Sequence, residues 1–254
     1  MRKRKTAVLL FMFCLPGLFL LPVSSGQTGK GDARAPGAAQ QQDSPVDYKS
    51  RGESFWEKGS VEEAISDFDR AIESTPGDAE LYFLRAKAYN SRRQFGKAIS
   101  DYNRAIEIDP GYSKAYFSRG LHYLNGEEYK KAISDFTAVI KISPDNAPAY
   151  YYRGSAHFSI KRYRKALSDY NKAIKIDPEY VNAYINRGYY YQTRAEFPKA
   201  ITNYKKALEL NPESPAARQM LENAITDYQL YQERIRDNSK LKDQGVTIRN
   251  DHYF

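Results

Sequence analysis

The sequence repeats itself every 34 residues after residue 44, through five consecutive units without an insertion or deletion. Each unit carries an aromatic residue, a small residue four positions later, an alanine twelve positions after that and a proline near its end. These recurring positions are Tyr48, Tyr82, Tyr116, Tyr150 and Tyr184; Gly52, Ala86, Gly120, Gly154 and Gly188; Ala64, Ala98, Ala132, Ala166 and Ala200; and Pro76, Pro110, Pro144, Pro178 and Pro212. The period divides residues 45–214 into the repeats 45–78, 79–112, 113–146, 147–180 and 181–214.

Each repeat is predicted to form two helices. In the second repeat, one apolar stripe at helical spacing ends before the polar stretch 91–94 and another begins after it. The first stripe is Tyr82, Ala86 and Tyr89, and the second is Ala98, Ile99, Tyr102, Ala105 and Ile106. The recurring small residues allow two helices to approach closely, and the proline ends each second helix because it lacks the N–H group that a continuing helix needs.

This pattern resembles the tetratricopeptide repeat (TPR), in which a large aromatic residue, Leu-Gly, Tyr, Ala, an aromatic residue and Pro recur at set spacings. The matching residues of the second repeat are Tyr82, Arg85, Ala86, Tyr89, Ala98, Tyr102 and Pro110. Arginine replaces the family's leucine in every repeat, and Phe55 and His157 replace the second tyrosine in two of them. The resemblance implies an all-α fold, a right-handed α-solenoid of antiparallel helix pairs.

The substituted arginines have possible partners in the second helices. Four second helices carry an aspartate at one fixed slot, and the fifth carries Asn203 there. The arginines are Arg51, Arg85, Arg119, Arg153 and Arg187, and the aspartates are Asp67, Asp101, Asp135 and Asp169. We expect the two rows to pair through charge-assisted hydrogen bonds between neighbouring helices. The alternative is a row of ligand-binding arginines.

The segments on either side of the repeats differ from them in composition. Four cations at residues 2–5, a continuous apolar run and then small residues give 1–26 the layout of a secretory signal peptide, with an uncleaved membrane anchor as the alternative. Residues 27–44 are too polar to bury a core and are predicted to be a disordered linker. An apolar stripe predicts that 215–236 form a helix capping the last repeat, followed by a disordered tail at 237–254 in which Val246 to Ile248 are a candidate short strand.

No enzymatic motif is present in the sequence. The one cysteine, Cys14, lies in the signal segment, so the remaining chain has no thiolate for catalysis, a disulfide or metal binding. Two histidines, His122 and His157, fall at core slots of the repeats, and no phosphate-binding loop or nucleophile motif occurs. The sequence therefore predicts a protein that is not an enzyme and has no metal and no cofactor.

In the TPR family the first helices of the repeats line a concave groove that usually binds a peptide. The resemblance places residues of the first helices at groove-facing slots, and eleven of them are predicted to bind the partner: Lys49, Phe83, Leu84, Lys87, Phe117, Leu121, Tyr151, Tyr152, Asn182, Asn186 and Tyr189. Aromatic anchors with a few polar neighbours are typical of partner-binding surfaces. The alternative is that several of these rings pack against adjacent repeats.

The net charge of +8 is unevenly distributed. The signal segment contributes four of these charges, residues 45–112 carry 10 basic and 13 acidic side chains, and residues 113–214 carry 17 and 10. Nucleic acid is therefore not the expected partner. The basic third to fifth repeats are either a solvated face or a contact surface for acidic polysaccharide or a membrane surface.

These observations favour an exported scaffold that is periplasmic or secreted, or anchored in the membrane by an uncleaved N-terminal segment. We expect it to bind a peptide or protein segment in its groove and to act in assembly of an envelope complex. The alternative function is a carbohydrate-binding helper in polysaccharide export, with Tyr151, Tyr152 and Tyr189 stacking on sugar rings.

Overall fold

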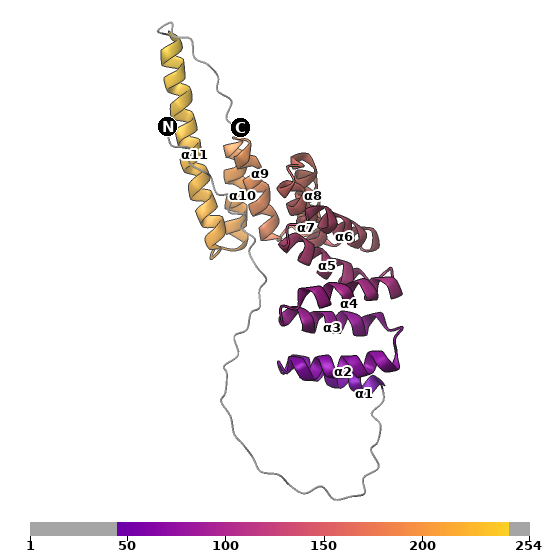
Figure 1. Cartoon of the computed structure of the whole chain (residues 1–254). Helices are drawn as coiled ribbons and strands as arrows, with labels where there is room; N and C mark the ends of the chain where they lie inside the picture. Colours follow the sequence, from indigo (N-terminus) through magenta and orange to yellow (C-terminus); the bar gives the residue numbers. More distant parts are fainter. Residues whose placement is uncertain (1–44, 244–254) are drawn as a thin grey trace, which may run out of the picture. The chain divides into compact units, whose positions relative to one another are not determined.

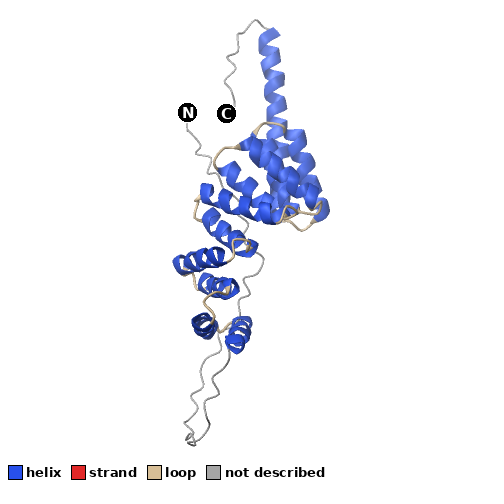
Figure 2. Cartoon of the chain, turned by 90° about the vertical axis from the view of Figure 1, so that its right-hand side faces the viewer, coloured by secondary structure: helices blue, strands red, loops and turns tan. Residues whose placement is uncertain are grey.

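The computed structural model describes residues 45–243, which form eleven α-helices and no strand (Figure 2). The helices are α1 (Pro45–Glu57), α2 (Val61–Ser74), α3 (Ala79–Ser91), α4 (Phe95–Ile108), α5 (Ser113–Asn125), α6 (Tyr129–Ile142), α7 (Ala147–Ser159), α8 (Tyr163–Ile176), α9 (Val181–Thr193), α10 (Phe197–Leu210) and α11 (Pro215–Asp243). They follow one another in chain order along the array (Figure 1). The predicted fold class, a right-handed α-solenoid of antiparallel helix pairs, is confirmed. The predicted signal segment and linker lie outside the described residues.

Each odd-numbered helix from α1 to α9 packs most extensively against the even-numbered helix that follows it, and each pair then packs against the next pair. Direct contacts between alternate helices join α1 to α3, α5 to α7 and α7 to α9. The odd-numbered helices therefore form the inner layer of the solenoid, which is where the groove residues were predicted to lie.

The contact between the two helices of a repeat depends on a small residue facing a large ring. The five aromatic side chains of the even-numbered helices that meet this slot are fully buried: Phe68, Tyr102, Phe136, Tyr170 and Tyr204. A Cβ atom added at Gly188 would lie 2.6 Å from Cε1 of Tyr204, closer than carbon atoms can approach without moving. Glycine at this slot thus permits the interhelical distance, as the repeat pattern predicted.

The turn between the helices of each repeat uses one residue in the left-handed conformation. In the first repeat this residue is Gly59, with φ of 79°. In the later repeats the same slot holds Arg93, Glu127, Lys161 and Ala195, with φ between 56° and 60°. Side chains other than glycine are strained in this region, so the tight turn is maintained by the packing of the helices that it connects.

The helix α11 packs on α10 and α9 through its N-terminal half, where Ala217 and Ala224 are fully buried. Its ring contacts are those of Phe197 with Tyr228 and Tyr231, at centroid distances of 6.0 and 5.5 Å. Figure 1 shows its C-terminal half continuing past α9 and α10.

The end of α11 requires a correction to the sequence prediction. The helix was expected to end at residue 236 but continues to Asp243, so the prediction of a disordered tail is wrong for residues 237–243. This stretch contains no glycine or proline to end a helix, and Lys240 lies 3.8 Å from Asp237 one turn earlier. The remaining tail, with the candidate strand Val246 to Ile248, lies outside the described residues.

Candidate binding groove

A cavity of about 350 Å³ lies on the inner layer between the second, third and fourth repeats. Two predicted groove residues, Phe83 of α3 and Phe117 of α5, contribute its aromatic walls. The polar and remaining lining residues are Ser113, Lys114, Ser118, Asn146 and Pro148. An apolar cavity with a few polar groups and one exposed lysine can accept a large side chain of a bound peptide.

The aromatic walls are held in position by other rings. Phe83 meets Tyr112 edge to face, with centroids 5.3 Å apart and an interplanar angle of 83°. Phe117 meets Tyr152 and Phe136, each with centroids 5.7 Å apart. Such contacts restrict the rotamers of both phenylalanines.

A second group of predicted groove residues meets further along the inner layer, between α7 and α9. The Asn186 side chain donates hydrogen bonds to the Tyr151 hydroxyl at 3.3 Å and to Ser155 Oγ at 3.2 Å. The Tyr151 ring also contacts Tyr152 and Tyr180, with centroids 4.9 and 5.1 Å apart. Burial raises the pKa of Tyr151 to about 12, so its hydroxyl is protonated at neutral pH and can donate a hydrogen bond.

The N-terminal groove residues are largely engaged with one another or with the core. The Lys49 ammonium of α1 forms an ion pair with Glu80 of α3. The Lys87 ammonium lies 5.6 Å from the ring centroid of Trp56, and Leu84 packs with the same tryptophan in the core between the first two repeats. Neither lysine is thus placed as an isolated charge at the groove surface.

The remaining three predicted residues differ in exposure. Leu121 packs in the core cluster around Phe136, and Tyr189 contacts Phe158 with centroids 5.4 Å apart. Asn182, near the start of α9, is exposed. Several of the predicted rings therefore pack against adjacent repeats, and two of them, Phe83 and Phe117, also line the cavity.

Several contributors were not among the eleven predicted groove residues, and besides the lining residues Ser113, Lys114 and Ser118 they include Tyr112, Tyr180, Asn146 and Pro148. Tyr112 and Tyr180 precede odd-numbered helices at equivalent slots, and each packs on a predicted ring. Asn146 caps α7 by accepting a hydrogen bond from the Ala149 N–H at 2.9 Å, and Pro148 follows it. The sequence could have indicated the two tyrosines, because Tyr112 and Tyr180 both occupy the last position of their 34-residue repeats.

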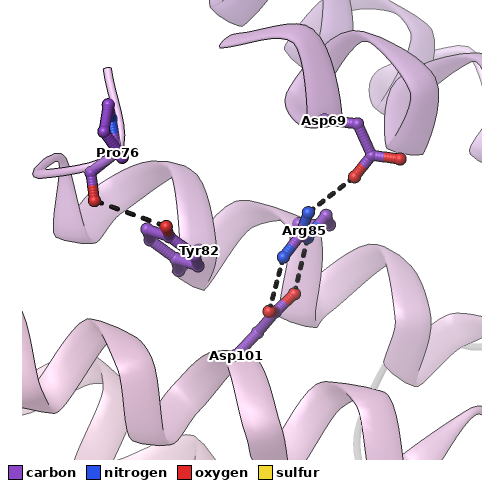
Figure 3. Close-up of polar contacts among 5 residues, drawn as sticks. All are labelled: Asp69, Pro76, Tyr82, Arg85 and Asp101. Carbon is purple, nitrogen blue, oxygen red and sulfur yellow. Dashed lines mark hydrogen bonds and ion pairs between the residues drawn. The ribbon is translucent and has the colours of Figure 1, made fainter. Parts of the chain in front are cut away.

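The predicted pairing of arginine and aspartate rows is confirmed. Arg85 donates from Nε and Nη2 to the two carboxylate oxygens of Asp101, at 2.8 and 2.7 Å, and from Nη1 to Asp69 at 2.6 Å (Figure 3). Since Asp69 belongs to α2 and Asp101 to α4, one guanidinium group joins three helices. The same two-oxygen pairing recurs for Arg51 with Asp67, Arg119 with Asp135 and Arg153 with Asp169. Four of the five arginines are thus structural.

The described residues contain no cluster of histidine, cysteine or carboxylate side chains arranged to hold a metal ion. His157 is buried and His122 half-buried, each with one ring nitrogen that has no hydrogen-bond partner among the described residues. Burial lowers the pKa of both histidines. Within residues 45–243, moreover, no helix combines the length and the apolar character that crossing a membrane requires.

Comparison with known proteins places this architecture in a family. Family models described as tetratricopeptide repeat match residues 50–113, 113–146, 147–180 and 181–214. No curated protein matches the sequence significantly.

Among solved structures, MamA 41-end from Desulfovibrio magneticus RS-1 is 22% identical, with 67% of this chain and 97% of that chain covered and a TM-score of 0.63. Another MamA crystal structure is 26% identical, with coverage of 64% and 95% and a TM-score of 0.60. YrrB, described as a TPR protein with an unusual peptide-binding site, is 18% identical, with coverage of 71% and 93% and a TM-score of 0.62. The TPR fold supports a protein interaction scaffold, and the chain belongs to the tetratricopeptide repeat family.

Proposed function

We propose that this chain is an exported, non-enzymatic scaffold that binds an extended segment of another protein in its groove and helps to assemble an envelope complex. The proposal that the chain binds a protein segment rests on the cavity between Phe83 and Phe117, which is lined by aromatic rings and polar groups. Export is supported by the cationic and apolar layout of residues 1–26.

The lining of the cavity indicates the chemistry of the bound segment. Two phenylalanine rings favour a large apolar side chain, while Ser113, Ser118 and Asn146 offer hydrogen bonds to the peptide backbone around it. The exposed ammonium group of Lys114 favours an acidic residue next to the apolar anchor. The proposed ligand is therefore an extended segment in which an apolar residue adjoins Asp or Glu.

Selection from a displayed library of random peptides tests this proposal. We expect the selected peptides to contain an apolar residue beside an acidic one. We expect Phe117→Ala to weaken their binding at least tenfold, because it removes one wall of the cavity. Lys114→Glu is expected to reverse the preference for the acidic neighbour without disturbing the fold, because this side chain is exposed.

Lys130→Glu is the matched control, since it makes the same charge change at an exposed position of α6 outside the cavity. Binding that is equal in wild type, Phe117→Ala and Lys114→Glu, with far-ultraviolet circular dichroism unchanged, would exclude the groove as the site. Retention on an acidic glycan matrix without any selected peptide would instead support the carbohydrate-binding function.

A further inference from the structure

The fifth repeat breaks the arginine–aspartate pattern of the other four. Its arginine, Arg187 of α9, donates from Nε to the amide oxygen of Asn203 at 2.8 Å and from Nη1 to the amide oxygen of Asn171, also at 2.8 Å. Both partners are neutral. The guanidinium group that meets a carboxylate in each of the first four repeats therefore meets none here.

The missing carboxylate leaves one donor atom unused. In the first four repeats Nη2 of the arginine donates to the second aspartate oxygen, at 2.7 Å in each. Nη2 of Arg187 has no acceptor among the described residues, because the Asn203 side chain instead donates its own Nδ2 to the Lys199 carbonyl at 2.8 Å. Burial lowers the pKa of Arg187, and although Tyr191 and Tyr184 oppose this effect no carboxylate does; the guanidinium group nevertheless remains cationic at neutral pH.

This arginine lines a cavity of about 370 Å³ between α9 and α10. The other lining residues are Tyr191, Pro198, Lys199, Thr202 and Asn203, none of which is acidic. The Lys199 ammonium lies at the edge, 2.6 Å from Glu196, which is not part of the lining. None of the eleven predicted groove residues contributes to this cavity, so it is separate from the groove.

We propose that this cavity binds a carboxylate, supplied by an Asp or Glu side chain of a partner protein, through Nη2 of Arg187. The array itself indicates the ligand class, because the same guanidinium slot holds a carboxylate in four repeats out of five. A planar carboxylate accepts hydrogen bonds from a guanidinium group in a geometry that other anions match less well. Tyr191 adds an aromatic ring to the lining, and the Lys199 ammonium, which already pairs with Glu196, lies 5.3 Å from the centroid of that ring.

The inference rests on the proposed scaffold function for the source of the carboxylate, but its chemistry is independent of the groove. A partner that inserts an acidic side chain here would be held at the last repeat in addition to its segment in the groove. Two contacts on one array raise the affinity and fix the direction in which the partner lies.

The decisive variant is Asn203→Asp, which rebuilds the pair found in the other repeats. It supplies Arg187 with an internal carboxylate and is expected to preserve or raise stability, so a loss of binding cannot be ascribed to unfolding. The probe is the blocked tripeptide Ac-Glu-Glu-Glu-NH₂, followed by nuclear magnetic resonance through the Arg187 Nε–H signal and the amide signals of α10. We expect saturable shifts in the wild type and at least tenfold weaker binding in Asn203→Asp.

Three further arms separate the possible outcomes. Asn125→Asp makes the same charge change at an exposed position two repeats away and is expected to bind as the wild type does. Ac-Gln-Gln-Gln-NH₂ is expected not to bind, and acetate and inorganic phosphate are expected to bind more weakly than the acidic tripeptide. Equal binding by wild type and Asn203→Asp, binding of the glutamine peptide, or tighter binding of acetate or phosphate would each overturn the proposal.

The test of the Arg187 site can be distinguished from a test of peptide binding in the groove. Phe117→Ala leaves the α9–α10 cavity unchanged, so it is expected to bind the acidic tripeptide with wild-type affinity. A protein that binds the tripeptide but no groove peptide would contradict the proposed groove function alone. A protein that binds groove peptides in both wild type and Asn203→Asp but never the tripeptide would contradict only the inference about Arg187.

Discussion

The Arg85 guanidinium and the Asp101 carboxylate form a pair of parallel hydrogen bonds, at 2.8 and 2.7 Å, between the two helices of the second repeat (Figure 3). Their side chains are only 18% and 8% exposed. The TPR family has leucine at the position of Arg85, so in this chain an ionic contact replaces an apolar one. Because Arg85 also holds Asp69 of α2, the contact joins successive repeats as well as the helices within one repeat.

Replacing Asp101 with alanine should be strongly destabilising. The substitution leaves Nε and Nη2 of the largely buried Arg85 without their acceptors, although Asp69 still pairs with Nη1, and unsatisfied buried donors typically cost about 1–3 kcal/mol. The free energy of unfolding, measured by urea titration with circular dichroism, is expected to fall by about that amount.

Asp67→Ala in the first repeat is the matched control for this substitution. Its partner Arg51 is 40% exposed, so water and salt screen the charge that remains. We expect a clearly smaller loss of stability. Equal losses in the two repeats would show that burial of the arginine does not determine the strength of the pair.

Adding a methyl group at Gly188 should destabilise the last repeat. The new Cβ atom would lie 2.6 Å from Cε1 of the fully buried Tyr204, and relief requires α9 and α10 to move apart. Overpacking of this kind typically costs about 1–3 kcal/mol, which exceeds the gain in helix propensity from glycine to alanine.

Gly96→Ala is the control for Gly188→Ala, because no atom lies within 4 Å of the added Cβ in the first turn of α4. It is expected to leave the free energy of unfolding unchanged or to raise it by up to about 1 kcal/mol. A Gly188→Ala protein as stable as the wild type would mean that the α9–α10 distance is not set by this contact.

Stability should fall as the pH is lowered through about 6.5, the ordinary pKa of histidine. Burial lowers the pKa of His157, and the nearby Arg153, Lys165 and Arg162 lower it further, although Asp169 opposes them. The unfolded chain therefore binds a proton more readily than the folded one, and the free energy of unfolding decreases as the pH drops.

His157→Tyr tests the origin of this pH dependence, since tyrosine occupies the same slot in three other repeats. Urea midpoints at pH 7.5 and 5.5 are expected to differ less in the variant than in the wild type. His122→Ala, which introduces the alanine of the neighbouring repeats, should reduce the difference further. An unchanged difference in both variants would assign the pH dependence to other groups.

The two halves of α11 should contribute unequally to stability. Deleting residues 215–243 uncovers Phe197 and the apolar surface around it, so amide exchange protection in α9 and α10 is expected to drop at least tenfold. Ending the chain after Tyr231 removes residues that are mainly exposed where the structure describes their side chains, and this truncation should have little effect. Protection of α1 to α4 should be the same in both proteins, because each repeat contacts mainly its neighbours; a uniform loss would contradict this one-dimensional behaviour.

The sequence predicted four features of the fold correctly. These are the repeat length, the helix pairs, the small residues that face aromatic rings and the arginine–aspartate pairs. Each depends on the spacing of residues within one or two helices, where the helical period determines which side chains share a face. The end of α11 was missed because polar composition was taken as a sign of disorder, although no residue in 237–243 interrupts a helix.

Only the tertiary structure shows which of the predicted groove residues line a cavity and which are enclosed by other side chains. Phe83 and Tyr151 occupy equivalent slots, yet Phe83 lines a cavity while Tyr151 is enclosed by Tyr152, Tyr170 and Tyr180. The difference comes from side chains of neighbouring helices and of the turn before the next repeat, and exposure depends on how all of them pack. The sequence alone established that Asn203 interrupts a row of aspartates. Only the tertiary structure shows that Arg187 meets two neutral amide oxygens and lines a cavity, because these relationships depend on contacts between separate helices.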